Sequence, residues 1–212
     1  MIPVILNAKP SNNESRTSRS VGSSQADKAA SHERIVEAAS RRIRREGIDT
    51  VSVSELMRQA GLTHGGFYRH FDSRDELVAV AIAEALAQGS KRIHASSRLG
   101  RPEALAATID GYLTRRHRDK PETGCAVAAL ATDIARADSR ARAAYSRQVR
   151  SHIDLLAELT PARDRDEGHL ILAALVGALL LARAVDDRGL SNEILETAAR
   201  ALRSHVDDAQ EV

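Results

Sequence analysis

The stretch SVSELMRQAGLTHGGFYRHFDSRDEL, residues 52–77, decides the fold because it contains the starts of three short helices. Ser52 and Ser73 are each followed three residues later by glutamate, the capping-box pattern that satisfies backbone N–H groups at a helix start. Thr63 is a further N-cap residue. Gly61 stands between the first two helices, where a left-handed backbone ends one helix and turns the chain sharply. This pattern predicts a helix-turn-helix.

The run AGLTHGGFYRHFDSRDEL, residues 60–77, resembles the DNA-binding domain of TetR/AcrR-type transcriptional regulators. The shared features are the Ala-Gly turn, a tyrosine followed three residues later by phenylalanine, and a serine with an acidic pair before leucine. The specific resemblance covers residues 31 to 78, and the remainder is similar in length, helical content and order. It implies an all-α fold of about nine helices, with an N-terminal helix-turn-helix three-helix domain and a C-terminal helical domain for ligand binding and dimerisation.

The composition favours helix throughout, because the 212 residues are rich in Ala, Leu and Arg and contain no long alternating β-branched run. The formal net charge is +2, and the positive excess lies in the first 100 residues, as expected for a DNA-facing half. A single cysteine excludes an internal disulfide and favours a reducing cytosol. The N-terminus lacks the pattern of a signal peptide, and the apolar run 170–182 is too short for a bilayer span of about 20 residues.

We expect three regions along the chain. Residues 1–30 are predicted to be a disordered tail, either inert or a basic arm that touches DNA phosphate. Residues 31–77 form the helix-turn-helix domain, and residues 78–212 form the effector-binding and dimerisation domain. The helices are expected over residues 31–46, 53–60, 64–71, 74–97, 102–118, 125–136, 138–159 and 167–185, with a last helix capped by Ser191. The two helices after residue 167 are expected to pair with a second subunit, as the resemblance implies.

DNA binding requires groups that hold phosphates and a few side chains that reach base edges. The helix starts supply backbone amides for phosphate, and His64 and Tyr68 lie on one exposed face four residues apart. Phe67 and Phe71 have the spacing of core residues and are not counted as contacts. The predicted DNA-binding residues are Ser52, Thr63, His64, Gly65, Gly66, Tyr68, His70 and Arg74.

Two positions depart from the family pattern. Gly66 stands where the family often has Thr, Ser or Ala, and Met57 occupies an interior position that is usually Ala. Two adjacent glycines, Gly65 and Gly66, disfavour a short α-helix by about 1 kcal/mol each relative to alanine. These departures leave the operator sequence open.

The C-terminal half offers few polar or aromatic side chains for an effector. Tyr112, Cys125, Tyr145 and His152 are the candidates, and the scarcity of aromatic residues favours a small aliphatic or polar effector. Cys125 opens a predicted helix near a basic run, so it is either a sensor of electrophiles or oxidants or a buried apolar residue.

No catalytic motif is present, and the spacing of the eight histidines does not suit a metal. We therefore expect no enzyme activity, cofactor, metal or membrane partner. The expected function is a cytoplasmic, ligand-responsive repressor that binds a palindromic double-stranded operator as a homodimer. The alternatives are a thiol-based repressor acting through Cys125 and an all-helical interaction protein that does not bind DNA.

Overall fold

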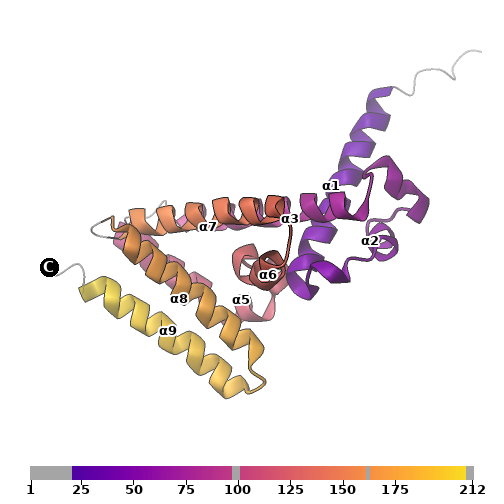
Figure 1. The fold of residues 1–212 in the computed structure, drawn as a ribbon. Helices are drawn as coiled ribbons and strands as arrows, with labels where there is room; N and C mark the ends of the chain where they lie inside the picture. The colour runs from indigo at the N-terminus through magenta and orange to yellow at the C-terminus, as the bar shows by residue number, and fades with distance from the viewer. Residues whose placement is uncertain (1–20, 97–100, 161–162, 209–212) are drawn as a thin grey trace, which may run out of the picture.

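The computed structural model describes residues 21–96, 101–160 and 163–208, and these residues are helical with no strand (Figure 1). The α-helices are α1 Val21–Glu46, α2 Val53–Gln59, α3 Arg74–Ser96, α4 Arg101–Tyr112, α5 Arg115–Asp119, α6 Ala126–Ala135, α7 Ser139–Leu159, α8 Arg165–Ala184 and α9 Arg188–Asp208. Three short 3₁₀ helices join them: η1 Ile48–Thr50, η2 His64–Arg69 and η3 Pro121–Thr123. The predicted all-α fold is confirmed.

One end of the molecule is built from α1, α2, η2 and the start of α3 (Figure 1). Phe67 and Phe71 are both buried there, with their ring centroids 5.6 Å apart. Leu56 from α2 and Ile35 from α1 are also fully buried in this part of the core. Burial of each such side chain contributes about 1.5–3 kcal/mol, so the two phenylalanines predicted as core residues hold this short segment together.

Helix α3 connects this end to the rest of the chain. It packs against α1 and then against α4, α6 and α7. The boundary that we placed between residues 77 and 78 therefore falls inside one continuous helix. A rigid helix that belongs to both cores can transmit a displacement from one to the other.

The opposite end is a layer of long helices in which α7 packs against α8, and α8 against α9 (Figure 1). The apolar run 170–182 lies inside α8, which is 20 residues long and passes the length and composition test for a membrane span. Our expectation that the run is too short for a membrane span considered only residues 170–182 and not the whole of α8. The position of α8 between α7 and α9 is that of a core helix.

The caps follow the sequence in part. Ser73 Oγ accepts the Glu76 N–H at 3.1 Å, as predicted, and Asp138 Oδ1 accepts the Ala141 N–H at 2.8 Å at the start of α7. Ser52 stands at the N-cap of α2 but makes no side-chain cap bond. Ser191 lies inside α9 and donates to the carbonyl of Ala182 at 2.6 Å, so the prediction that it caps the last helix is wrong.

Three predicted helices differ clearly from the structure in extent, continuity or type. Helix α1 begins at Val21, so residues 21–30 are helical and not part of a disordered tail, while residues 1–20 lie outside the described residues. The helix expected over 102–118 is divided into α4 and α5, because Thr114 has an extended backbone and its side chain accepts the His117 N–H. The helix expected over 64–71 is the 3₁₀ helix η2, which follows from the weak α-helix preference of its two glycines.

Candidate functional site

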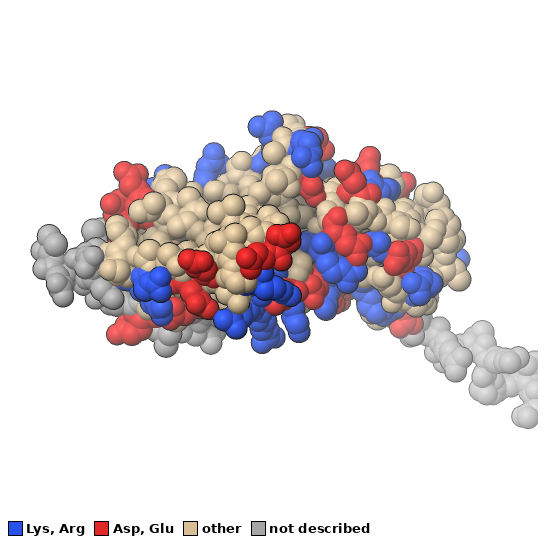
Figure 2. Space-filling view, turned by 90° about the horizontal axis from the view of Figure 1, so that it is seen from below, with Lys and Arg blue, Asp and Glu red and all other residues tan. Residues whose placement is uncertain are grey.

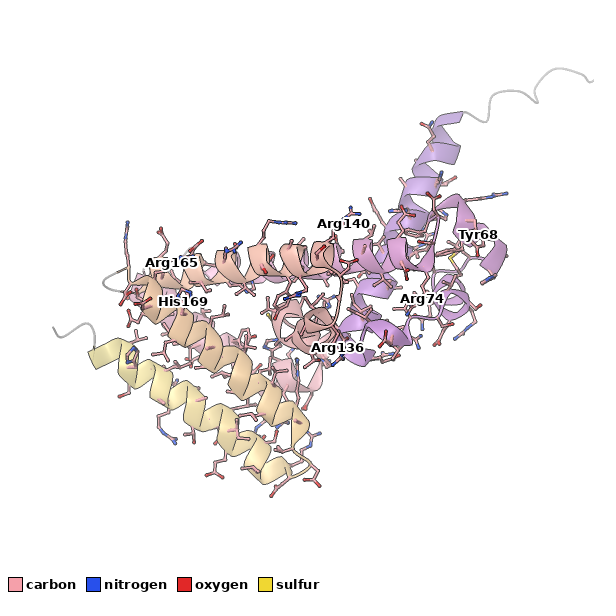
Figure 3. All side chains as sticks on the ribbon, in the orientation of Figure 1. Tyr68, Arg74, Arg136, Arg140, Arg165 and His169 are labelled. Carbon is pink, nitrogen blue, oxygen red and sulfur yellow. The ribbon has the colours of Figure 1, made fainter. Side chains whose placement is uncertain are left out.

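The η2 turn presents a polar surface at the end of the molecule. Thr63, His64 and Gly65 are exposed, and Tyr68 has 70% of its surface accessible. Tyr68 stands edge-on to the buried Phe67, with 5.3 Å between ring centroids, and Figure 3 shows it remote from α8 and α9. An exposed tyrosine fixed on a buried phenylalanine leaves a hydroxyl that can donate to an external acceptor.

His64 is oriented by a residue that the sequence analysis did not identify. Its Nδ1 lies 3.0 Å from Ser54 Oγ, which joins η2 to α2. This bond leaves Nε2 as the ring nitrogen that can reach an external group. Ser54 lies in α2 and His64 in η2, ten residues apart, so no pattern within one helix pairs them. The packing of α2 against η2 brings the two side chains together.

Gly66 and Met57, the two departures from the family pattern, meet in the structure. A Cβ built on Gly66 would lie 3.5 Å from Met57 Cε, and Met57 is fully buried. The Met57 side chain, larger than the usual alanine, therefore occupies space next to Gly66, which has no side chain. The two departures compensate each other in volume, which keeps the packing of α2 on η2.

Arg74 does not lie free for a phosphate. Its guanidinium donates to the carbonyl oxygens of Val51 at 3.0 Å, Ile48 at 3.0 Å and Asp49 at 3.2 Å. These bonds tie the first turn of α3 to η1. The sequence could not reveal them because the acceptors are backbone atoms 23 to 26 residues away. Arg74 is a structural clamp, and the prediction that it contacts DNA is withdrawn.

His70 also differs from expectation. Its ring is partly buried and lies 6.1 Å from that of His32 in α1, so it faces α1 and not the surface of Tyr68. Burial, reinforced by the nearby positive groups His32, Lys28 and Arg69, lowers the pKa of His70. A neutral, inward-facing imidazole is a poor phosphate ligand, and His70 leaves the set of proposed contacts.

The surface charge of the protein is mixed. Figure 2 shows basic and acidic side chains interspersed over the face seen from below, with no uniform positive sheet. The predicted excess of positive charge in the first 100 residues therefore does not form a single patch on that face. On that face, charge alone therefore marks no single site of attraction for DNA.

Three of the four predicted effector residues converge near the start of α6. Cys125, its N-cap, is buried, and its backbone N–H donates to His117 Nε2 at 2.9 Å. The other ring nitrogen of His117 lies 2.7 Å from the Tyr112 carbonyl, so this imidazole is neutral with its proton on Nδ1. Tyr145 from α7 donates its hydroxyl to the Val127 carbonyl at 2.7 Å.

The Tyr112 hydroxyl is different, because it is buried and has no hydrogen-bond partner of acceptable geometry among the described residues. Burial, together with the nearby Cys125 thiol, raises the pKa of Tyr112 well above its usual value. Burial likewise raises the pKa of Tyr145 to about 12. Both phenols are neutral donors at physiological pH.

Arg183 of α8 completes this cluster and was missed by the sequence analysis. It donates to the carbonyls of His117 at 2.7 Å and Arg118 at 3.2 Å, and burial lowers its pKa. The basic run that we expected beside Cys125 is directed elsewhere. Arg118, for example, binds Ser191 and Asn192 at 2.8 Å each.

The contact that His152 makes to Gln148 lies within its own helix, α7. His152 is buried in α7, two turns beyond Tyr145, and its Nε2 lies 2.9 Å from the Gln148 side chain. The effector residues placed together are therefore Tyr112, Cys125 and Tyr145, with His117 and Arg183 added by the structure.

The fold and the exposed η2 turn define a helix-turn-helix protein with an all-helical second domain. Residues 35–81 match the family model of bacterial regulatory proteins, tetR family. This match covers the helix-turn-helix and the start of α3, so this part of the chain is similar to the DNA-binding region of tetR-family regulators.

Individual relatives agree with this assignment. YvdT of Bacillus subtilis (strain 168), an uncharacterized HTH-type transcriptional regulator, is 31% identical over 93 residues. That match covers 42% of this chain and 47% of YvdT, so it spans about half the length of this curated relative.

Solved structures extend the likeness of fold over most of the chain. A TetR regulator from Chloroflexus aurantiacus J-10-FL has a TM-score of 0.70 at 24% identity and covers 86% of this chain and 96% of its own. A TetR-family regulator from Agrobacterium tumefaciens scores 0.71 at 20% identity, covering 84% and 98%. The reduced form of E. coli NemR scores 0.70 at 18% identity, covering 82% and 95%.

Proposed function

We propose that this protein is a repressor that binds a palindromic DNA operator as a homodimer, with η2 in the major groove. The observation that carries the proposal is the exposed surface of Thr63, His64, Gly65 and Tyr68 above a core closed by Phe67. In this arrangement Tyr68 and the amides of η2 hold phosphates, and His64 Nε2 reaches a base edge. Ser52 and Gly66 stay in the proposed interface. The proposal includes no catalytic step, and its place of action is the cytoplasm.

Dimerisation is proposed through α8 and α9. Among the described residues, Leu170 and Leu181 of α8 and Leu190 of α9 are the large aliphatic side chains left exposed, at 53%, 58% and 44% of their surface. A second copy that covers them would remove this apolar surface from water, at about 25 cal/mol per Å². A two-fold dimer presents two η2 turns, which requires half-sites spaced by whole turns of DNA.

The experiment that tests DNA recognition is selection of duplexes from a random pool by the full chain. The wild type should enrich a palindromic sequence, while Tyr68→Ala should enrich none at the same protein concentration. Glu103→Ala is the matched control, because Glu103 is an exposed residue of α4 in the other domain. Failure of the folded wild-type dimer to enrich any sequence would favour the interaction-protein alternative.

We further propose that a small effector binds beside Tyr112, Cys125 and Tyr145 and changes DNA affinity. The support is the buried Tyr112 hydroxyl, a donor whose desolvation is not offset by a partner of acceptable geometry in the part of the chain that the structure describes. A small molecule with a carbonyl or hydroxyl acceptor would satisfy it. The test is a thermal-shift screen of such compounds in which Tyr112→Phe loses the response of the wild type.

The second candidate is a thiol-responsive repressor, favoured by the position of Cys125 beside that same hydroxyl. In this case oxidation or alkylation of the thiol, and not reversible binding, releases the operator. Cys125→Ser separates the two, because it abolishes the response to thiol reagents but leaves the response to a reversible effector. An unchanged response of Cys125→Ser to oxidants and electrophiles rules out the thiol mechanism.

A further inference from the structure

We propose that Asp133, in α6 of the C-terminal domain, is a positioning residue that sets the orientation of η2 toward DNA; this inference rests on the proposed DNA-binding function. Asp133 does not belong to the helix-turn-helix. Its Oδ2 accepts the backbone N–H of Ile48, the first residue of η1, at 2.9 Å. A carboxylate acceptor makes this a charge-assisted hydrogen bond between the two domains.

The chain at η1 is shaped for this contact. Gly47 precedes Ile48 with φ of +91°, a left-handed conformation that glycine adopts without strain. A Cβ on Gly47 would lie 3.1 Å from Asp133 Oδ2, so a side chain there would press on the carboxylate. Within the turn, the Thr50 hydroxyl donates to the Gly47 carbonyl at 2.8 Å, whereas the acceptor for the Ile48 N–H comes from α6.

The other side of η1 is held by Arg74, whose guanidinium donates to the carbonyls of Ile48 and Asp49 and to that of Val51. Arg74 is the first residue of α3 and follows η2 after four residues. The single turn η1 is therefore fixed from one side by Asp133 and from the other by the helix that begins after η2. Figure 3 shows Arg74 between Tyr68 and Arg136, the residue that also donates to Asp133 at 3.3 Å.

The segment just before α6 is bonded to α1 as well. Arg44 of α1 is buried and donates to the Gly124 carbonyl at 3.5 Å and to Gln88 Oε1 of α3 at 2.9 Å. Gly124 directly precedes Cys125 in the proposed effector site. The α6 segment thus contacts the DNA-binding end near both ends of the helix, and Asp133 is the contact that reaches η1, the turn that Arg74 bonds to the start of α3.

The test uses the full-length dimer and the duplex that the wild type selects from a random pool, together with duplexes derived from it. The derivatives have one base pair added or removed between the half-sites, and a further duplex carries a single half-site. Asp133→Ala should bind the selected duplex about tenfold more weakly, the scale of one charge-assisted hydrogen bond. It should also lose most of the wild-type discrimination against altered spacing, while its affinity for the single half-site stays unchanged.

Two further variants separate positioning from general damage. Asp133→Asn keeps an oxygen acceptor and should restore part of the affinity and the spacing preference. Arg136→Ala removes the other partner of Asp133 without touching Ile48 and should behave as the wild type. Wild-type behaviour of Asp133→Ala on every duplex overturns the inference, as does an equal loss on the single half-site. If Asp133→Ala does not fold, Asp133→Asn carries the same comparison.

Amide hydrogen exchange provides a readout that does not depend on DNA. In Asp133→Ala the Ile48 amide should exchange about tenfold faster. The amides of Gly66, in η2, and His70, just after it, should also exchange faster than in the wild type. Faster exchange at Ile48 with unchanged exchange in η2 overturns the positioning role. A wild type that selects no duplex sequence, by contrast, refutes the proposed function and leaves this exchange result to decide whether α6 holds η2.

Discussion

Two tyrosines near Cys125 are expected to respond to loss of the hydroxyl in opposite ways. Tyr112→Phe removes a buried hydroxyl that has no partner of acceptable geometry among the described residues. Tyr145→Phe removes a hydroxyl that donates to the Val127 carbonyl at 2.7 Å. The two changes delete the same atom from the same residue type in one cluster, so their difference reports the hydrogen bond.

The magnitudes follow from desolvation. A buried polar group left without a partner costs about 1–3 kcal/mol, and the nearby weakly accepting thiol of Cys125 places Tyr112 toward the lower end. Tyr112→Phe should therefore raise the free energy of unfolding by about 1 kcal/mol. Tyr145→Phe should lower it by about 0.5–1.5 kcal/mol, the net value of a neutral hydrogen bond. In a chain of this size, 1 kcal/mol moves Tm by about 2–4 °C.

The assay is urea unfolding followed by circular dichroism, with a thermal scan at the same protein concentration because dimerisation couples to unfolding. The urea dependence of the unfolding free energy should be equal for the three proteins, so that midpoints compare directly. A Tyr112→Phe protein that is destabilised as much as Tyr145→Phe would refute the reasoning, because the Tyr112 hydroxyl would then have a partner.

The remaining predictions concern packing, backbone and pH. Gly168→Ala should lower the unfolding free energy by about 1–3 kcal/mol, because its Cβ would lie 2.6 Å from the Ile153 carbonyl. Gly111→Ala is the control in urea unfolding, and it should be stabilised because no atom lies within 4 Å of the added Cβ. Gly65→Ala should raise Tm, since no atom lies within 4 Å and about 0.4–1 kcal/mol of unfolded-state entropy is removed. Because the pKa of His70 is lowered in the folded protein, the unfolded chain binds the proton more tightly. The free energy of unfolding should therefore fall as the pH drops below about 6.5. His70→Gln should weaken this pH dependence in urea titrations at pH 5.5–7.5.

Local patterns in the sequence predicted the parts of the fold that depend on neighbours along the chain. The glycine turn at Gly61 has φ of +74°, and the cap at Ser73 is made as expected. Phe67 and Phe71 are both buried, as predicted, although Phe67 lies in the 3₁₀ helix η2 and Phe71 lies two residues after its end. In each case the determining interaction spans only a few residues.

The sequence was less informative where a side chain is bound to distant backbone. Arg74 has the position of a phosphate ligand in the family pattern, yet three carbonyls in and after η1 take its donors. His70 follows the exposed Tyr68 by two residues, but it turns inward toward His32. Asp133 and Arg183 had no local signal, because their partners come from other helices and become neighbours only after tertiary packing.

Fluorescence anisotropy is the most direct test of whether the exposed η2 turn reads DNA. The full-length protein would be titrated onto duplex DNA from upstream of its own gene and onto a scrambled duplex, at several salt concentrations. We expect the wild type to prefer the upstream duplex, with an affinity that decreases log-linearly with salt. We expect Tyr68→Ala to lose both the preference and this salt dependence. A folded dimer that binds neither duplex, or a Tyr68→Ala protein that binds as the wild type does, would contradict recognition of DNA by η2.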